Sequence, residues 1–279
     1  MGSPKHNALI PLIIERDPEE AEAGEITVEG SVGGRPYRFL LDTGAAISRV
    51  ASDDYTAGLP SVEQHQSSGV FRPSSDDLIT VPLVQVGPIS RPNMTLARAS
   101  DGAAEVANLI GMDVLKDFRL QFDFANNRLA LDPPEDVGDA VSFHELRLDK
   151  RFHPYVDVQF GQTTANAVWD SGTSLTVADT DFVNRNPEFF REAGQSMGTD
   201  STGHEMTAPL FVMSGVLIGN FPFPAHRVAA VNLSSVNATT DVPMDLILGY
   251  STLRHADWLL DFPRLRWALL RTGAVSSSA

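Results

Sequence analysis

Residues 39–45 read Phe-Leu-Leu-Asp-Thr-Gly-Ala, and residues 167–173 read Ala-Val-Trp-Asp-Ser-Gly-Thr. Each segment places an Asp-hydroxyl-Gly tripeptide directly after an apolar run, and the two aspartates are Asp42 and Asp170. One such tripeptide carries little information. One copy in each half of a 279-residue chain indicates an internal duplication.

Further landmarks recur in the same order in the two halves. Before the aspartate lies a stretch in which polar and apolar residues alternate. After the aspartate come, in order, a Thr-x-Pro-Leu motif, an apolar-apolar-Gly motif and an Asp-Phe pair. In the first half they lie at residues 25–29, 80–83, 109–111 and 123–124, and in the second at 155–159, 207–210, 247–249 and 261–262. This period is far too long for a solenoid, so we predict two duplicated lobes.

The boundary between the predicted lobes follows from residues 132–138, which are polar and include two prolines that cannot donate to a sheet. The expected domains are residues 1–135, carrying Asp42, and residues 136–279, carrying Asp170. With both aspartates in one chain, we expect a monomer.

Bulk composition excludes several classes of function. The formal net charge of −15 argues against a nucleic acid as partner, because a phosphate backbone needs a positive face. The absence of cysteine excludes thiol catalysis, disulfides and cysteine metal sites. The seven histidines show no metal-ligand spacing, so we expect neither a metal nor another cofactor. No apolar run approaches the roughly 18 residues of a membrane helix.

The compartment is unknown from composition. The N-terminus lacks the basic segment and cleavage site of a signal peptide, which favours the cytoplasm, while a mature secreted or periplasmic form is also compatible with the sequence.

Short alternating segments separated by Gly, Pro, Asn and Asp dominate the chain and predict an all-β fold of many short strands. Residues 126–127, Asn-Asn, are typical of a hairpin turn. Two helices are expected: a short one opening at residues 111–115 and a longer one over residues 179–193.

The repeated tripeptide permits acid–base chemistry. A glycine after the hydroxyl residue lets the loop turn tightly and lets another backbone approach. If the two loops face each other, Asp42 and Asp170 lie side by side and share one proton. The ionised member can then take a proton from water while the protonated member polarises a carbonyl, which is hydrolysis without a covalent intermediate.

These residues resemble the aspartic peptidases of the pepsin and retropepsin type, over roughly residues 25–131 and 154–270. Residues 108–115, Asn-Leu-Ile-Gly-Met-Asp-Val-Leu, are especially similar to the retropepsin version. The resemblance implies a bilobal fold of two β-barrel-like, retropepsin-like lobes with a cleft between them, and an endopeptidase acting on a peptide or protein substrate. It assigns catalysis to Asp42 and Asp170.

The resemblance also assigns supporting roles to the loop residues Thr43, Gly44, Ser171 and Gly172. In this family, a hydroxyl after the tripeptide stabilises the ionised aspartate, whereas Ala accompanies a less acidic optimum. Because Thr173 follows the second tripeptide and Ala45 the first, we expect Asp170 to ionise more easily and the pH optimum to be mildly acidic.

The family closes its cleft with a flap hairpin that carries a Tyr in pepsins. The equivalent residues 66–79 contain no Tyr, so Gly69 and Phe71 are the candidate substrate contacts. In the second half, residues 196–206 with Gly203 are a further candidate flap.

Two alternatives stay open. A peptidase-like fold could bind peptides or proteins without cleaving them. Residues 194–198, Gly-Gln-Ser-Met-Gly, match the Gly-x-Ser-x-Gly elbow of serine hydrolases, but the elbow needs a strand before Ser196 and a helix after it. The order of predicted elements is the reverse, so we expect a loop or flap there.

Overall fold

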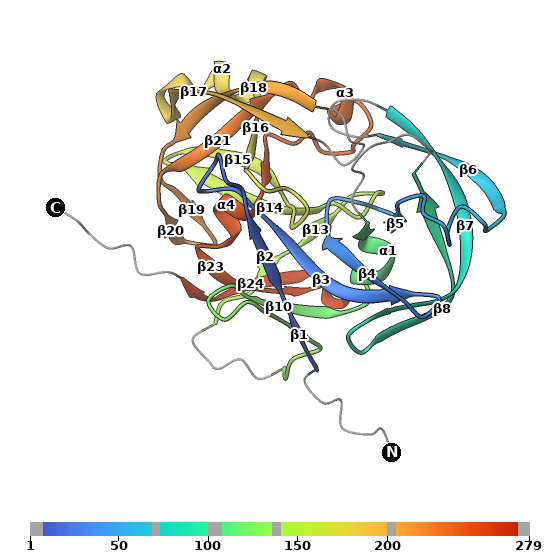
Figure 1. Ribbon diagram of the computed structural model, residues 1–279. Helices are drawn as coiled ribbons and strands as arrows, with labels where there is room; N and C mark the ends of the chain where they lie inside the picture. Colours follow the sequence, from blue (N-terminus) through green and yellow to red (C-terminus); the bar gives the residue numbers. More distant parts are fainter. Residues whose placement is uncertain (1–7, 69–72, 100–107, 136–140, 200–204, 273–279) are drawn as a thin grey trace.

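A computed structural model describes residues 8–68, 73–99, 108–135, 141–199 and 205–272. Within these ranges the chain forms three sheets and only short helices, which confirms the all-β prediction (Figure 1). One sheet belongs to the N-terminal half, one to the C-terminal half, and the third joins the two halves. We keep residues 1–135 and 136–279 as the proposed lobes.

The N-terminal sheet runs in the order β2-β3-β4-β9-β5-β8-β7-β6, and an additional pairing of β3 with β7 curls it towards a barrel. In residues 79–86, Ile79 and the three valines are buried while Thr80, Pro82 and Gln85 are exposed, as one-sided burial of a sheet requires. Its strands are β2 (Ile13–Arg16), β3 (Gly24–Val32), β4 (Arg35–Leu41), β5 (Arg49–Val50), β6 (Ser61–Ser68), β7 (Pro73–Val86), β8 (Ile89–Arg98) and β9 (Leu109–Ile110).

The C-terminal sheet repeats this plan in the order β17-β18-β21-β16-β22-β15-β14-β19-β20, with β13 paired to β14. Its strands are β13 (Arg147–Leu148), β14 (Pro154–Phe160), β15 (Thr163–Trp169), β16 (Val177–Asp179), β17 (Phe190–Thr199), β18 (Glu205–Met213), β19 (Val216–Ile218), β20 (Phe221–Phe223), β21 (His226–Val231) and β22 (Leu246–Leu248). In both sheets, the strand before the aspartate pairs in parallel with the strand of the apolar-apolar-Gly motif.

The third sheet lies below the other two in Figure 1 and combines strands from both ends of the chain, in the order β1-β11-β10-β23-β24-β12. Its strands are β1 (Ala8–Pro11), β10 (Arg119–Asp123), β11 (Arg128–Leu131), β12 (His144–Glu145), β23 (Ala256–Asp261) and β24 (Arg266–Thr272). The halves meet where β10 pairs with β23 in antiparallel register. The repeated Asp-Phe motifs lie at the ends of these two strands.

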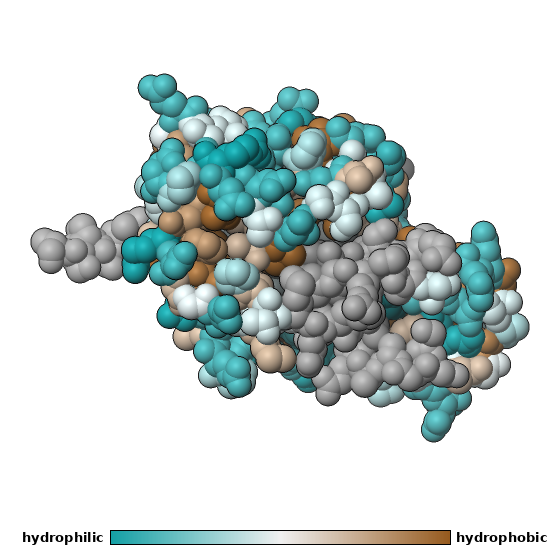
Figure 2. Space-filling view, turned by 90° about the horizontal axis from the view of Figure 1, so that it is seen from above, coloured by the Kyte–Doolittle hydropathy of each residue, from teal (hydrophilic) through white to brown (hydrophobic). Residues whose placement is uncertain are grey.

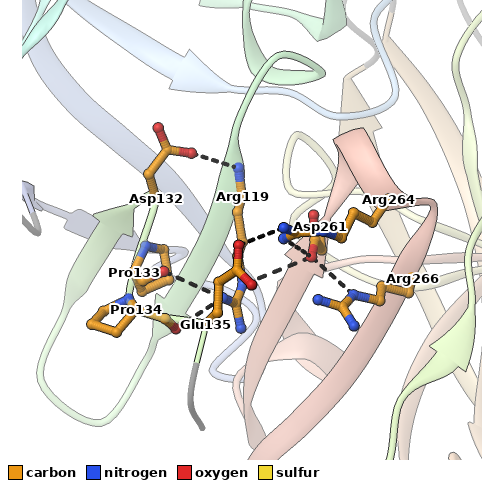
Figure 3. A network of polar contacts seen from close by, with 8 residues as sticks. All are labelled: Arg119, Asp132, Pro133, Pro134, Glu135, Asp261, Arg264 and Arg266. Carbon is orange, nitrogen blue, oxygen red and sulfur yellow. Dashed lines mark hydrogen bonds and ion pairs between the residues drawn. The ribbon is translucent and has the colours of Figure 1, made fainter. Parts of the chain in front are cut away.

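An ion-pair network centred on the buried side chain of Asp261 crosses this junction (Figure 3). The side chain of Asp261 is 1% exposed and contacts Arg119 at 3.9 Å, Arg264 at 3.4 Å and Arg266 at 2.9 Å. Arg119, on the opposite strand, also donates to the carbonyl oxygens of residues 133 and 134. The network therefore ties the segment that leaves the first half to the last strands of the chain.

The helices are α1 (Met112–Leu115), α2 (Thr180–Arg185), α3 (Ser234–Asn237) and α4 (Tyr250–Leu253), with 3-10 turns η1 (Pro187–Phe189) and η2 (Phe262–Arg264). The short helix after Gly111 and the turn at residues 126–127 are confirmed. The helix predicted over residues 179–193 is wrong beyond residue 185, because Pro187 interrupts it and residues 190–199 pair with β18 instead.

Strand register corrects one landmark of the repeat. Leu78 lies opposite Ala97, and Leu210 lies opposite Ala229, at the same place in the two sheets. The structural equivalent of Leu210 is therefore Leu78 and not Leu83, so the two Thr-x-Pro-Leu motifs do not occupy equivalent positions. The other landmarks mark equivalent strands.

The core is built from large apolar side chains of all three sheets, among them Trp169, Trp258 and Phe122, each under 2% exposed. Trp169 contacts both Phe122 and Trp258, so residues from both halves share one core beneath the aspartate loops. Hydrophilic residues cover most of the described surface in Figure 2, with smaller apolar areas between them.

Candidate active site

Each aspartate follows a buried strand and is held by its neighbour in the sheet. The backbone N–H of Asp42 donates to Ile110 O, and that of Asp170 donates to Leu248 O, both at 3.0 Å. The apolar runs of β4 and β15 anchor these strands in the core. The apolar-apolar-Gly motifs thus lie beside the aspartate loops.

The hydroxyl residues interlock the two loops. Thr43 Oγ1 donates to the carbonyl oxygen of Trp169 at 2.8 Å and accepts the backbone N–H of Ser171 at 3.1 Å. In return, the backbone N–H of Thr43 donates to Ser171 Oγ at 3.2 Å. All these atoms are buried, so each loop fixes the position of the other.

The interlock brings Asp42 and Asp170 side by side. The backbone N–H of Gly44 donates to Asp42 Oδ1 at 2.9 Å and also contacts Asp170 Oδ1 at 3.2 Å. The N–H of Gly172 donates to Asp170 Oδ1 at 2.8 Å. A Cβ at Gly44 would lie 2.5 Å from Asp170 Oδ2, and one at Gly172 would lie 2.4 Å from Asp42 Cγ. The close approach therefore requires glycine at both positions.

One hydroxyl distinguishes the two carboxyl groups. Thr173 Oγ1 donates to Asp170 Oδ2 at 2.7 Å, whereas Ala45 occupies the equivalent position beside Asp42 and has no side-chain donor. Burial, and after it the negative charge of Asp170, raises the pKa of Asp42 well above the usual range of an aspartate. Asp42 therefore favours its protonated form.

A buried polar network that the sequence analysis missed supports the first loop. Asp113 accepts the hydroxyl of Ser48 at 2.6 Å and the backbone N–H of Ser48 at 3.0 Å. Ser48 Oγ accepts the N–H of Gly111 at 3.0 Å. Burial raises the pKa of Asp113, although its bonds to Ser48 act in the opposite direction.

The second loop has the same support with different side chains. Thr176 Oγ1 accepts the N–H of Gly249 at 3.0 Å and lies 2.7 Å from Thr252 Oγ1. Thr252 Oγ1 in turn lies 2.7 Å from His226 Nε2, and His226 Nδ1 is 2.9 Å from Pro224 O. A carbonyl only accepts, so Nδ1 carries the proton, and burial lowers the pKa of this neutral histidine.

A sequence signal for both networks exists. Ser48 and Thr176 lie at the same distance after Asp42 and Asp170, and each is a hydroxyl residue. A register comparison of the two repeats would have found them.

The aspartates lie in an open cleft of about 430 Å³. Its walls come from both halves, and near the aspartates they include Ala45, Ala46, Ile47, Arg49, Asp76, Ala97 and Leu109 on one side and Thr173, Ser174, Leu175, Val177, Ala208, Ala229 and Ile247 on the other. Among the described residues, no group of three or more acidic or histidine side chains could hold a metal ion. No helix within them is long and apolar enough to cross a membrane.

The candidate flap residues Gly69, Phe71 and Gly203 lie outside the described residues, so their contact with substrate stays a prediction. The adjoining strands β6 and β7 do form a hairpin, and β17 and β18 form its equivalent in the second half. Ser196 lies within β17, and its Oγ contacts the carbonyl oxygen of Met197. It therefore does not lie on the strand-to-helix turn that a serine hydrolase elbow needs.

Comparison with known proteins defines the class of fold. The structure matches the crystal structure of the aspartic proteinase from Irpex lacteus with a TM-score of 0.61 and 14% sequence identity, over 97% of this chain and 98% of that chain. The chain thus has the bilobal fold of a pepsin-like aspartic proteinase.

A family model described as aspartyl protease matches residues 28–114, which include Asp42 and the motif ending at Gly111. Together with the fold, this confirms the resemblance to aspartic peptidases of the pepsin and retropepsin type. The comparison with curated proteins gave no match.

Proposed function

We propose that the protein is an aspartic endopeptidase in which Asp42 and Asp170 together activate a water molecule for attack on a peptide bond. The observation that carries this proposal is the interlocked pair of loops, which holds both carboxyl groups against the N–H of Gly44. The family match to the first half and the matching fold support the same class, a hydrolase.

In the proposed mechanism, the two carboxyl groups have different roles. Asp170, whose carboxylate accepts bonds from Gly172 N–H and the Thr173 hydroxyl, acts as the base that takes a proton from water. Asp42, which favours its protonated form, donates a hydrogen bond to the substrate carbonyl. The interlock between Thr43 and Ser171 keeps these groups in place, and no cofactor enters the proposed reaction.

Digestion of an unbiased peptide library between pH 3 and 8 tests the proposal. Wild type, Asp42→Asn and Asp170→Asn are compared, with thermal melting as the check on folding. We expect cleavage by the wild type and a loss of about 10⁴-fold or more in each folded variant, because neither remaining carboxyl group can act as both acid and base. Equal cleavage by wild type and both variants would refute the two-aspartate mechanism. The same set with Ser196→Ala added would detect a serine mechanism.

A further inference from the structure

The internal repeat places groups of opposite charge at equivalent positions in the wall of the cleft. Thr27 and Tyr155 are equivalent, because each lies opposite the residue two before its aspartate in the strand pairing. Glu25 and His153 each precede these residues by two, and both line the cleft. The same position is therefore an acid in the first half and a base in the second.

The next cleft-lining position continues this difference. Ala23 and Arg151 each lie a further two residues back, and both line the cleft. The first half also lines the cleft with Asp17 and Glu20. This part of the wall thus carries carboxylates where the first half forms it, and a guanidinium and an imidazole where the second half forms it.

The acidic and basic segments lie on opposite sides of the aspartate pair. The reciprocal hydrogen bonds between the two aspartate loops relate them by an approximate two-fold rotation, so equivalent residues lie across it from each other. Contacts with the opposite half agree. Glu20 binds Arg227 of β21 at 2.9 Å, whereas the ring centroid of Phe152 lies 5.6 Å from Nζ of Lys116, at the end of α1. A peptide lying along the cleft therefore meets acid on one side of the aspartates and base on the other.

Glu25 and Arg151 are the charges that a substrate can reach. Within the residues that the structure describes, neither side chain forms an ion pair or a hydrogen bond, and both remain accessible to solvent. His153, in contrast, already binds Asp149, with 2.8 Å between Nδ1 and the carboxylate. A charged substrate group can thus pair with Glu25 or Arg151 without breaking an existing ion pair.

The surroundings of Glu25 favour a cation. Glu15 lies opposite Glu25 in β2, and Asp17 follows two residues later. Partial burial, and after it the charges of Glu15 and Asp17, raise the pKa of Glu25. The nearby Arg38 binds Glu15, and Arg16 lies over an aromatic ring of the second half, so neither is bound to Glu25. A substrate cation would relieve this repulsion and favour the ionised form of Glu25.

We infer that the protein takes peptides with a basic side chain, Lys or Arg, on one side of the scissile bond and an acidic side chain, Asp or Glu, on the other. The basic side chain binds at Glu25 and the acidic one at Arg151. The unequal roles of Asp42 and Asp170 fix the direction of the peptide, so only one order of the two charges fits. This inference rests on the proposed function, because it assigns the two groups to the two sides of the bond.

Binding of three peptides tests the inference without turnover. Each carries a non-cleavable hydroxyethylene group between two Leu residues, flanked by three Lys before and three Glu after, by the reverse order, or by Ser on both sides. Calorimetry at low ionic strength, where screening is weak, gives the dissociation constants. The first two peptides have the same composition, so the net charge of the protein affects both alike.

We expect one of these two charged peptides to bind at least about tenfold more tightly than its reverse. One order forms two attractive contacts, whereas the other forms two repulsive ones. The uncharged peptide should bind with intermediate affinity. Equal binding of the two charged peptides, or no binding by any of the three, would overturn the inference.

A double variant, Glu25→Lys with Arg151→Glu, exchanges the two charges, and thermal melting checks that it folds. We expect the order of charges that the wild type disfavours to become the preferred one. The control Glu29→Lys with Lys150→Glu makes the same exchange in the same two segments, at exposed residues outside the cleft, and should keep the wild-type preference. An unchanged preference in the folded double variant Glu25→Lys with Arg151→Glu would contradict the assignment.

The same charged sequences with an ordinary peptide bond separate the two proposals. If one order of the hydroxyethylene peptide binds best, but neither ordinary peptide nor any member of the library is cleaved, the endopeptidase proposal fails and the charge assignment holds. If both orders are cleaved with equal kcat/KM, the endopeptidase proposal holds and the charge assignment fails.

Discussion

At the scale of single residues, the two aspartates have unequal surroundings although their loops are related by the internal repeat. Thr173 donates to Asp170, and Ala45 leaves Asp42 without an equivalent donor. The difference comes from one side chain in each loop and can be exchanged. It predicts that Asp42 sets the alkaline limb of the pH profile of activity.

Placing a hydroxyl beside Asp42 by the substitution Ala45→Thr should favour its ionised form and lower its raised pKa. The alkaline limb of the kcat/KM profile reports loss of the proton held by Asp42, so this limb should move to lower pH. A hydrogen bond to a charged group contributes about 1.5–3 kcal/mol, which corresponds to roughly one to two pH units.

The converse change, Thr173→Val, removes the hydrogen bond from Thr173 Oγ1 to Asp170 Oδ2 and should lower kcat/KM by about tenfold or more, since a hydrogen bond to a charged group is lost. Both profiles are measured on one peptide substrate across pH 3 to 8. If the alkaline limb of Ala45→Thr stayed in place or moved to higher pH, or if Thr173→Val kept the wild-type kcat/KM, the assignment of acid and base would be wrong.

Gly172 offers a test of the close approach itself. In Gly172→Ala, the new Cβ would lie 2.4 Å from Asp42 Cγ, so the loops must separate. Moving two reacting groups apart by about 1 Å costs on the order of 100-fold in kcat. The control Gly58→Ala meets only ordinary contact, at 3.5 Å, and should retain wild-type kcat. Full activity in Gly172→Ala would mean that the loops tolerate a wider spacing.

At the scale of elements, the two loops rest on different chemistry at equivalent positions. The first uses the carboxyl group of Asp113, and the second uses hydroxyl groups and the neutral His226. Because the pKa of Asp113 is raised in the folded protein, its contribution to the free energy of unfolding is fully present below its unfolded pKa of about 3.9. That stabilisation is lost as pH rises through the folded pKa, because the folded state then has to bury a charge.

The variant Asp113→Asn tests this dependence. Asn has one acceptor oxygen where Asp113 uses two, so one bond to Ser48 is lost and the variant is less stable at every pH, by about 1–3 kcal/mol. Asn does not titrate, so the variant lacks the pH-dependent contribution of Asp113. The difference in the free energy of unfolding between wild type and variant should therefore be largest near pH 3 and should become smaller as pH rises. Urea unfolding between pH 3 and 8 measures this difference. A difference that became larger towards neutral pH would contradict the prediction.

Some helices and strands could be predicted from the sequence and others could not. The strands beside Asp42 and Asp170, and the short helix after Gly111, have strong local signals and were predicted. Residues 190–193, the first part of β17, were predicted as the end of a helix, because the partner strand β18 lies further along the chain and the apolar spacing up to Phe190 fits a helix. The ion pair between Arg49 and Asp76 in the cleft wall was also missed, since only the strand register brings these residues together.

At the scale of the whole molecule, the two halves are joined by pairing between β10 and β23 and by the ion pairs around Asp261 (Figure 3). Removing one partner of a buried pair leaves the other charge without compensation. Asp261 and Asp123 end equivalent strands, and Asp261 bridges the halves to Arg119. Asp123 instead accepts the N–H of Asn126 in its own turn and pairs with the half-exposed Arg128.

We therefore expect Asp261→Ala to lower the free energy of unfolding by about 3–5 kcal/mol, since Arg119 would remain buried without its carboxylate. The matched variant Asp123→Ala loses the bonds to Asn126 and Arg128 but leaves no buried cation behind, since Arg128 is 46% exposed, and should cost less than Asp261→Ala. Guanidinium unfolding of both variants measures the two values. If the two variants lost the same free energy of unfolding, the ion pairs at the junction would contribute no more to stability than the contacts of Asp123.

The shared sheet also has a consequence for how the chain is made. On the ribosome, β10 is completed long before β23, its neighbour in the sheet, has been synthesised. Until then the nascent chain presents an open sheet edge and an unfinished core, a state that invites pairing with the wrong strand. Contacts this distant in sequence make folding slow. Efficient production should therefore depend on conditions that protect the half-made chain, such as slow synthesis or a chaperone that covers this edge.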